Sequence, residues 1–80
     1  MNNDHIGFIL DHISPRISRM ELGEYTNCEG LFDKDLWNSV PPSEQSYVFE
    51  RPVSILVAQR KIPLEYAGFT RSQQNQYMKI

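Results

Sequence analysis

The chain has 80 residues, of which 40% are hydrophobic and 22% are charged, and its formal net charge at pH 7 is −2. This length fits one domain, 1–80, and leaves little room for an enclosed substrate cavity beside the core. The small negative charge excludes a general attraction to nucleic acid or to acidic lipid. We therefore expect a single globular domain that binds another macromolecule and is not an enzyme.

Cysteine content and apolar run length both indicate the cytoplasm. Cys28 is the only cysteine, whereas a secreted domain of this size usually depends on two or more disulfides. The first residues carry no basic segment of the kind found in signal peptides. The longest apolar run, 55–58, is far too short to span a bilayer. We expect a cytoplasmic protein that does not contact membranes.

The charges are divided unevenly along the chain. Residues 1–40 hold three basic and seven acidic side chains, a balance of −4. Residues 41–80 hold five basic and three acidic side chains, a balance of +2. Such a division favours different partners for the two halves. The acidic side chains that stand out in the first half are Glu21, Glu24, Glu29, Asp33 and Asp35.

Residues 4–13 are predicted to form a helix. Apolar residues recur at the i, i+3, i+4, i+7 spacing of one helical face from Ile6 to Ile13. Asp4 is suited to cap its beginning. Pro15 is expected to interrupt the helix, because proline lacks an N–H group and disfavours helix at the preceding residue. In an alternative interpretation, Pro15 opens a second short turn that carries Ile17 and Met20.

A short strand over 23–28 and a short helix over 33–40 are predicted next. Tyr25 belongs to the residue types that favour extended chain. Asp33 is suited to cap the helix, and Pro41 with the proline after it ends it.

The main helix is predicted over 43–61, the longest stretch without glycine. Ser43 is a favourable N-cap, and Glu44 lies where a negative charge interacts well with the helix dipole. Pro52 is expected to kink the helix. Because the segment 53–58 is rich in β-branched residues, a buried strand there is a competing interpretation.

The last segment, 64–80, has the pattern of a β-hairpin. Apolar and polar residues alternate on both sides of a four-residue polar tip, 71–74. The aromatic residues of the chain are dispersed, so we predict no base-stacking platform and expect most of them in the core.

The order helix, strand, short helix, turn, longer helix and hairpin resembles that of winged-helix domains, including small bacterial and phage proteins. The resemblance covers roughly residues 15–80. It implies an α+β fold, a small winged-helix-like domain with three helices and a C-terminal β-hairpin, and a DNA-binding role in transcription regulation. The residues that carry it are Gly23-Glu24-Tyr25-Thr26, Leu31-Phe32, Trp37 and the segment from Ser43 through Ile62 followed by the polar-tipped hairpin.

The resemblance also implies which residues contact double-stranded DNA. The helix over 43–61 would enter the major groove with its N-terminal half, and the hairpin tip would form the wing. The implied DNA-binding residues are Ser43, Gln45, Ser46, Arg51, Arg60, Lys61, Arg71 and Gln73. A monomer with net charge −2 would bind weakly, and a homodimer would double its basic surface.

An alternative function remains open at this point. The polar hairpin tip is also typical of an ordinary solvent-exposed loop. The chain would then be a protein-binding adaptor or inhibitor that presents its acidic N-terminal half to a basic partner and binds no DNA.

Two other groups of side chains yield no site. Asp4-His5-Ile6 recurs seven residues later as Asp11-His12-Ile13, whereas histidines that share a metal on a helix lie four residues apart. Cys28 has no local catalytic signature, and no third group is present to orient a pair with His12. We predict no metal and no cofactor, and a buried or half-buried thiol at Cys28.

Overall fold

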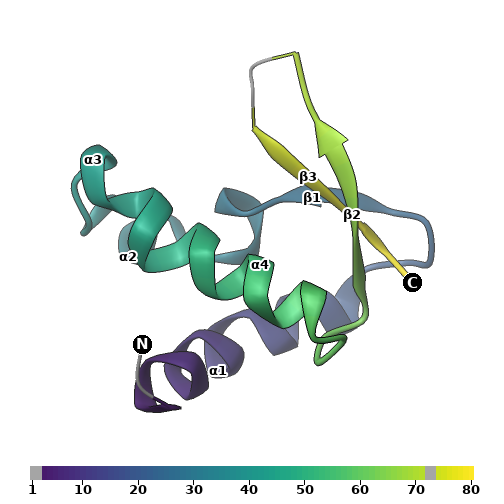
Figure 1. Ribbon diagram of the computed structural model, residues 1–80, viewed down its shortest axis with the longest axis horizontal. Coiled ribbons are helices and arrows are strands. Elements are labelled where there is room, and N and C mark those ends of the chain that lie inside the picture. Colours follow the sequence, from purple (N-terminus) through teal and green to yellow (C-terminus); the bar gives the residue numbers. More distant parts are fainter. Residues whose placement is uncertain (1–2, 72–73) are drawn as a thin grey trace.

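The computed structural model describes residues 3–71 and 74–80, with residues 3 and 4 described by their backbone alone. Within these ranges the chain is an α+β domain with three helices and a C-terminal β-hairpin, as predicted (Figure 1). A 3₁₀ turn, Glu29–Leu31, precedes the second helix, α2 (Lys34–Asn38). A π-helical turn, Ser46–Glu50, joins α3 (Pro42–Gln45) to α4 (Arg51–Ala58) in one continuous helix, 42–58. The elements are α1 (Asn3–Arg19), β1 (Tyr25–Asn27), α2 (Lys34–Asn38), α3 (Pro42–Gln45), α4 (Arg51–Ala58), β2 (Leu64–Phe69) and β3 (Asn75–Lys79).

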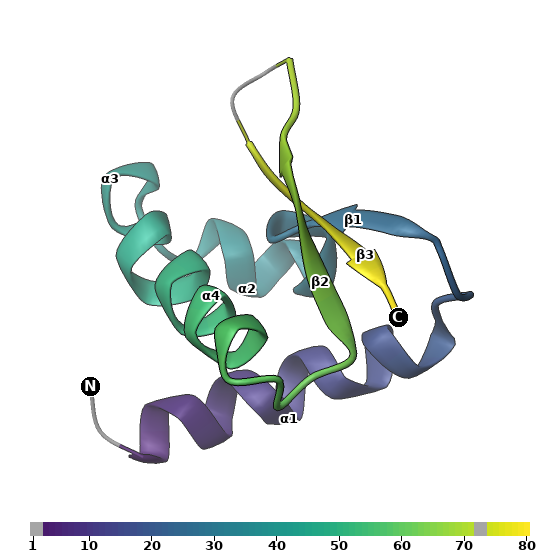
Figure 2. The same ribbon diagram turned by 45° about the vertical axis from the view of Figure 1, so that its right-hand side comes forward.

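The three strands form an antiparallel sheet in the order β1-β3-β2. Tyr77 of the central strand lies between Thr26 and Tyr66 on its two neighbours. The register of β2 shifts between Tyr66 and Phe69. The ends of β2 and β3 nearest the tip of the hairpin project away from the helices in both views (Figures 1 and 2).

The strand predicted over 23–28 is shorter than expected. Gly23 has a φ of 84° and belongs to the turn that precedes β1, which is a conformation that glycine adopts without strain. Cys28 has helical dihedral angles and begins the 3₁₀ turn. Only Tyr25–Asn27 pairs with β3.

The prediction that the first helix ends before Pro15 is wrong. α1 begins by Asn3, so Asp4 is a helical residue and not the preceding cap, and the helix continues to Arg19. The continuation places Ile17 on the same face as Ile9 and Ile13, and Ile17 is only 2% exposed. Burying such a side chain contributes ~1.5–3 kcal/mol, which offsets much of the roughly 3 kcal/mol that an internal proline costs a helix.

The helix predicted over 33–40 is limited to α2, Lys34–Asn38. Asp33 precedes it, but its side chain makes no capping hydrogen bond. The Asp33 carboxylate instead accepts a hydrogen bond from the guanidinium of Arg16 in the last turn of α1. Asp33 therefore connects α2 to α1 through Arg16 and does not cap α2.

The helix predicted over 43–61 begins and ends earlier. Pro41 precedes it, and Pro42 occupies its first turn, where a missing N–H group is tolerated, so Ser43 is not the cap. At the other end Arg60 adopts a left-handed conformation with φ of 56°. The N–H of Lys61 donates to the carbonyl of Leu56 at 3.0 Å, which ends the helix in a Schellman motif.

The competing strand at 53–58 is excluded, because α4 is helical through Ala58. Pro52 does not break the helix, which continues to Ala58. A π-helical turn lies directly before the proline, in which the Arg51 N–H donates to the Ser46 carbonyl, five residues back. A residue with an N–H group at position 52 of a regular helix would donate to the carbonyl of Val48. That carbonyl accepts a hydrogen bond from Nε2 of His5 on α1, at 3.0 Å.

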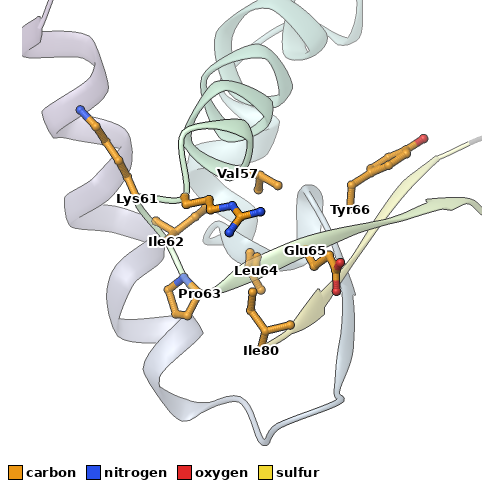
Figure 3. A pocket seen from close by; sticks show the side chains of 9 residues that line it. Val57, Lys61, Ile62, Pro63, Leu64, Glu65, Tyr66 and Ile80 are labelled. Carbon is orange, nitrogen blue, oxygen red and sulfur yellow. The ribbon is translucent and has the colours of Figure 1, made fainter.

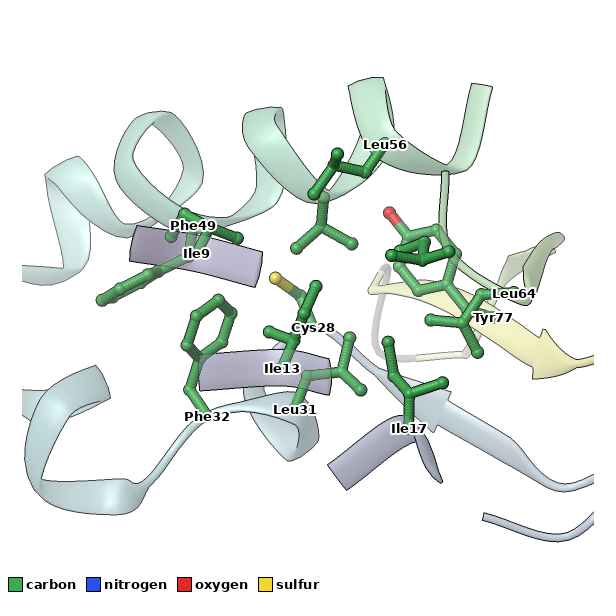
Figure 4. Packing of buried hydrophobic residues seen from close by; sticks show 12 residues of the cluster. Ile9, Ile13, Ile17, Cys28, Leu31, Phe32, Phe49, Leu56, Leu64 and Tyr77 are labelled. Atoms are coloured by element: carbon green, nitrogen blue, oxygen red, sulfur yellow. The ribbon is translucent and has the colours of Figure 1, made fainter. Parts of the chain in front are cut away.

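The core lies between α1, α4 and the inner face of the sheet (Figure 4). Within the described ranges, no helix combines the length and the apolar character that crossing a membrane requires. The buried hydrophobic residues are Ile9, Ile13, Ile17, Cys28, Leu31, Phe32, Phe49, Val53, Leu56, Ile62, Leu64 and Tyr77.

Burial of Cys28 is expected to make the stability of the protein fall at alkaline pH. Desolvation, and secondarily the negative charge of Glu50, raises the pKa of the thiol well above its ordinary value. The unfolded chain therefore releases this proton at a pH where the folded protein retains it. The stabilisation is complete below the ordinary thiol pKa and declines above it by up to ~1.4 kcal/mol per pH unit.

Denaturant unfolding at about pH 7.5 and about pH 9.5 would measure this decline. Cys28→Ala is less stable at both values because it leaves a small cavity, but it should lose much of the pH dependence. An equal decline in the wild type and in Cys28→Ala would contradict the assignment.

Candidate nucleic-acid interface

A polar groove lies between helix 42–58 and the hairpin. Its helical wall consists of residues three or four positions apart, which therefore share one face of the helix. Asn75 of β3 contributes to the opposite wall. The lining residues are Ser43, Ser46, Tyr47, Glu50, Arg51, Ser54 and Asn75.

Arg51 and Tyr47 form the most prominent pair on the helical wall. Tyr47 is 62% exposed, and the guanidinium carbon of Arg51 lies 5.7 Å from the centre of its ring. This cation–π contact restricts the arginine side chain without neutralising its charge. The groove therefore presents a positive group in a partly fixed position.

The hairpin adds exposed aromatic side chains. Tyr66 and Phe69 of β2 contact each other edge to face, and the Tyr66 hydroxyl donates to Oδ1 of Asn75 at 3.3 Å. The expectation that most aromatic residues belong to the core is wrong, because five of the nine are exposed: these two and also Phe8, Tyr25 and Tyr47.

A hydrogen bond between side chains holds the two walls together. The Tyr77 hydroxyl and the Ser54 hydroxyl lie 3.2 Å apart, joining the central strand to α4. Tyr77 is buried, and burial raises the pKa of its hydroxyl although the bond with Ser54 acts in the opposite direction. The position of the hairpin relative to the helix is therefore fixed within the fold.

The structure brings three of the predicted DNA-binding residues together: Ser43, Ser46 and Arg51 are all exposed and line the groove. Gln45 is half-buried and does not line the groove, and its amide Nε2 donates to the carbonyls of Trp37 and Val40, each at 3.1 Å. It thereby closes the turn between α2 and α3.

The other predicted residues lie away from the groove. Arg60 and Lys61 are exposed beyond the C-terminal end of α4, where they line a second groove. Arg71 is exposed next to the end of β2. Gln73 lies outside the described residues.

Sequence reasoning missed four residues of the groove: Tyr47, Glu50, Ser54 and Asn75. The helical repeat indicates that Tyr47 shares a face with Ser43 and Arg51, because it lies four residues after the first and four before the second. The place of Asn75 depends on the pairing of β3 and has no local signal.

The five acidic residues that stand out in the first half are exposed and lie in separate segments. Glu21 and Glu24 lie in the turn after α1, whereas Glu29 and Asp35 lie around the 3₁₀ turn and α2. Asp33 forms its ion pair with Arg16.

The two histidines flank an aromatic residue. Phe8 stacks with His5 at 6.4 Å and contacts His12 at 4.5 Å between ring centroids. In the part of the chain that the structure describes, no group of three or more His, Cys, Asp and Glu side chains is placed to hold a metal ion.

No protein-family model, no curated protein and no solved structure matches this chain. Function is accordingly inferred from the residues and their geometry.

Tyr77→Phe tests the bond that holds the groove together. It removes one partly buried hydrogen bond while keeping the aromatic ring, so we expect a loss of roughly 0.5–1.5 kcal/mol in the free energy of unfolding. Tyr66→Phe is the matched control, because the bond from its hydroxyl to Asn75 is exposed to solvent and should contribute less. Denaturant unfolding of both variants measures the difference, and an equal or larger loss in Tyr66→Phe would contradict the role of Tyr77.

Proposed function

We propose that this chain is a winged-helix domain that binds double-stranded DNA and acts in transcription regulation. The observation that carries the proposal is the polar groove between the exposed face of helix 42–58 and the hairpin. A three-residue connection, 39–41, joins α2 to this helix, which is the usual length of the turn in a helix-turn-helix unit.

The dimensions of helix 42–58 suit the major groove of DNA. At 1.5 Å per residue the helix is about 25 Å long, and the major groove, about 12 Å wide, admits an α-helix. Three exposed side chains near its N-terminal end carry hydroxyl groups, namely Ser43, Ser46 and Tyr47. Their hydroxyl groups both donate and accept hydrogen bonds, as contacts with base edges require.

Arg51 is assigned to a guanine edge or to a phosphate. Its guanidinium can donate two parallel hydrogen bonds to either group. The contact with Tyr47 limits the conformations that Arg51 would lose on binding.

The hairpin is assigned to the DNA backbone. Arg71 lies exposed beside the end of β2, in position to bind a phosphate. Phe69, which is 71% exposed, supplies an apolar surface for a sugar or a thymine methyl group.

The charges of this face predict weak electrostatic attraction. Arg51 and Arg71 are accompanied by two carboxylates, Glu44 and Glu50. Because phosphate contacts provide most of the sequence-independent affinity, this face should bind non-specific DNA detectably at low salt and only weakly at moderate salt, and base contacts would supply most of the affinity for a specific site.

Fluorescence anisotropy with a mixed pool of duplex DNA at several salt concentrations tests the proposal. With two arginines contacting phosphates, log K should fall against log[salt] with a slope of about −2. Absence of binding even at low salt would contradict the proposal. It would favour recognition of a protein through the acidic residues of the first half.

Substitutions identify the binding face. Arg51→Ala and Arg71→Ala should each weaken binding by a factor of about 5–10 and reduce the salt slope by about 1 if the arginine contacts a phosphate. Arg19→Ala is the matched control, because it removes the same charge from an exposed position on α1. An equal loss in Arg19→Ala would show that net charge, and not this face, governs binding.

Glu44→Gln provides a test of the opposite sign. The side chain is exposed and lies beside Ser43 at the beginning of helix 42–58. Removing its charge should strengthen DNA binding by a factor of roughly 2–5, while the free energy of unfolding should fall by about 0.3–1 kcal/mol because the interaction with the helix dipole is lost. Weaker binding in this variant, in the same anisotropy titration, would argue against the assigned orientation of the helix.

A further inference from the structure

Three segments meet at the end of the sheet farthest from the hairpin tip. The N–H of Gly23, in the turn 21–24, donates to the carbonyl of Lys79 at 2.9 Å. The N–H of Ile80 donates to the carbonyl of Pro63 at 3.0 Å. The turn 21–24, Ile80 and the segment 60–65 thus form one backbone-bonded surface, which we call the end surface.

The end surface carries two exposed apolar side chains, Leu22 and Ile80. Leu22 at the top of the turn is 80% exposed, and Ile80 is 54% exposed. Gly23 holds the turn in a left-handed conformation, so Leu22 has a defined position. Apolar side chains grouped in this way are typical of a contact surface.

A groove opens beside Ile80 on the same surface (Figure 3). Figure 3 shows Leu64 and Ile80 at its base, with Pro63 next to them. Lys61 extends from one side of the groove and Glu65 lies on the other. The groove offers an apolar base of the kind that an exposed leucine fills.

The charges beside the two apolar parts are opposite. Glu21 and Glu24 flank Leu22, and both are exposed. Arg60, Lys61 and Glu65 line the groove and are all exposed, so the charged side chains of the groove sum to +1. A leucine between two carboxylates therefore complements a groove whose net charge is positive, and both halves of this match lie on one molecule.

The backbone at Arg60 supports a role for its side chain. Arg60 has a φ of 56° at the position where a Schellman motif usually has glycine. A left-handed conformation strains a residue other than glycine by roughly 1–2 kcal/mol. This strained backbone conformation occurs at a residue whose side chain lines the groove.

We propose that the end surface joins two copies of this chain in a two-fold symmetric homodimer. Leu22 of each copy enters the groove beside Ile80 of its partner, and Glu21 and Glu24 approach the partner's Arg60 and Lys61. Because each molecule carries both the leucine and the groove, the contact is self-complementary, as two-fold symmetry requires. The interface is independent of DNA, since the proposed DNA-binding face lies at the other end of helix 42–58.

Sedimentation equilibrium of the full chain without DNA tests the proposal. The wild type should reach a dimer as its concentration rises and remain a dimer thereafter. Leu22→Asp should raise the dissociation constant about tenfold or more, and it should leave the fold intact because the side chain is exposed. Phe69→Asp is the matched control, since Phe69 is also a highly exposed apolar residue but lies on the hairpin.

A wild type that stays monomeric, or one that forms open-ended polymers, would overturn the symmetric dimer. So would a larger effect of Phe69→Asp than of Leu22→Asp.

Charge reversal tests the ion pairs separately. Glu21→Lys alone and Lys61→Glu alone should each weaken the dimer, because each brings like charges together across the interface. The double variant, with both changes in one chain, restores opposite charges at both symmetric contacts and should recover most of the affinity. Failure of the double variant to recover would contradict the proposed pairing.

Arg60→Gly separates dimerisation from folding. Glycine relieves the left-handed strain, so the thermal midpoint of the monomer should rise or stay unchanged. Dimer affinity should nevertheless fall, because the guanidinium is lost from the groove. Unchanged dimerisation in Arg60→Gly would remove Arg60 from the interface.

Discussion

One apolar stripe on α1, formed by Ile9, Ile13 and Ile17, must be buried, and the other elements are arranged around it. A chain of 80 residues has a thin core and no second layer to compensate for a missing part. Because the stripe includes Ile17, α1 remains helical through Pro15. Because α4 packs on α1, the helix that contains α4 has to continue past Pro52 as well.

The second proline is accommodated by two features that lie far apart in sequence. The π-helical turn 46–50 widens the helix directly before Pro52, and the Val48 carbonyl receives a hydrogen bond from His5 on α1. Proline has no N–H group that could donate to the Val48 carbonyl, and His5 on α1, the helix against which α4 packs, donates to it instead. The same turn contains Tyr47, so this local adjustment also forms part of the wall of the polar groove.

The sequence predicted the order of elements and the hairpin, because apolar periods and polar turns are local signals. Two predicted boundaries next to prolines are wrong. The end before Pro15 neglects the free energy gained by burying Ile17 in the continued helix. The start at Ser43 neglects that a proline such as Pro42 is accepted in the first turn of a helix. The hydrogen bonds from Gln45 to the carbonyls of Trp37 and Val40 had no local signal in the sequence, because these groups become neighbours only in the folded chain. Tyr47 was missed because aromatic residues were expected in the core.

The two proposed surfaces lie toward opposite ends of helix 42–58, so one would not block the other. A DNA-binding face with two arginines and two carboxylates has little attraction for phosphates as a single copy. Joining two copies makes the second binding event intramolecular, which raises affinity without any new contact. A two-fold axis through the end surface would relate the two recognition helices by the same symmetry. If both proposals hold, the DNA site must consist of inverted half-sites, and their separation is fixed by the distance between the two helices of the dimer.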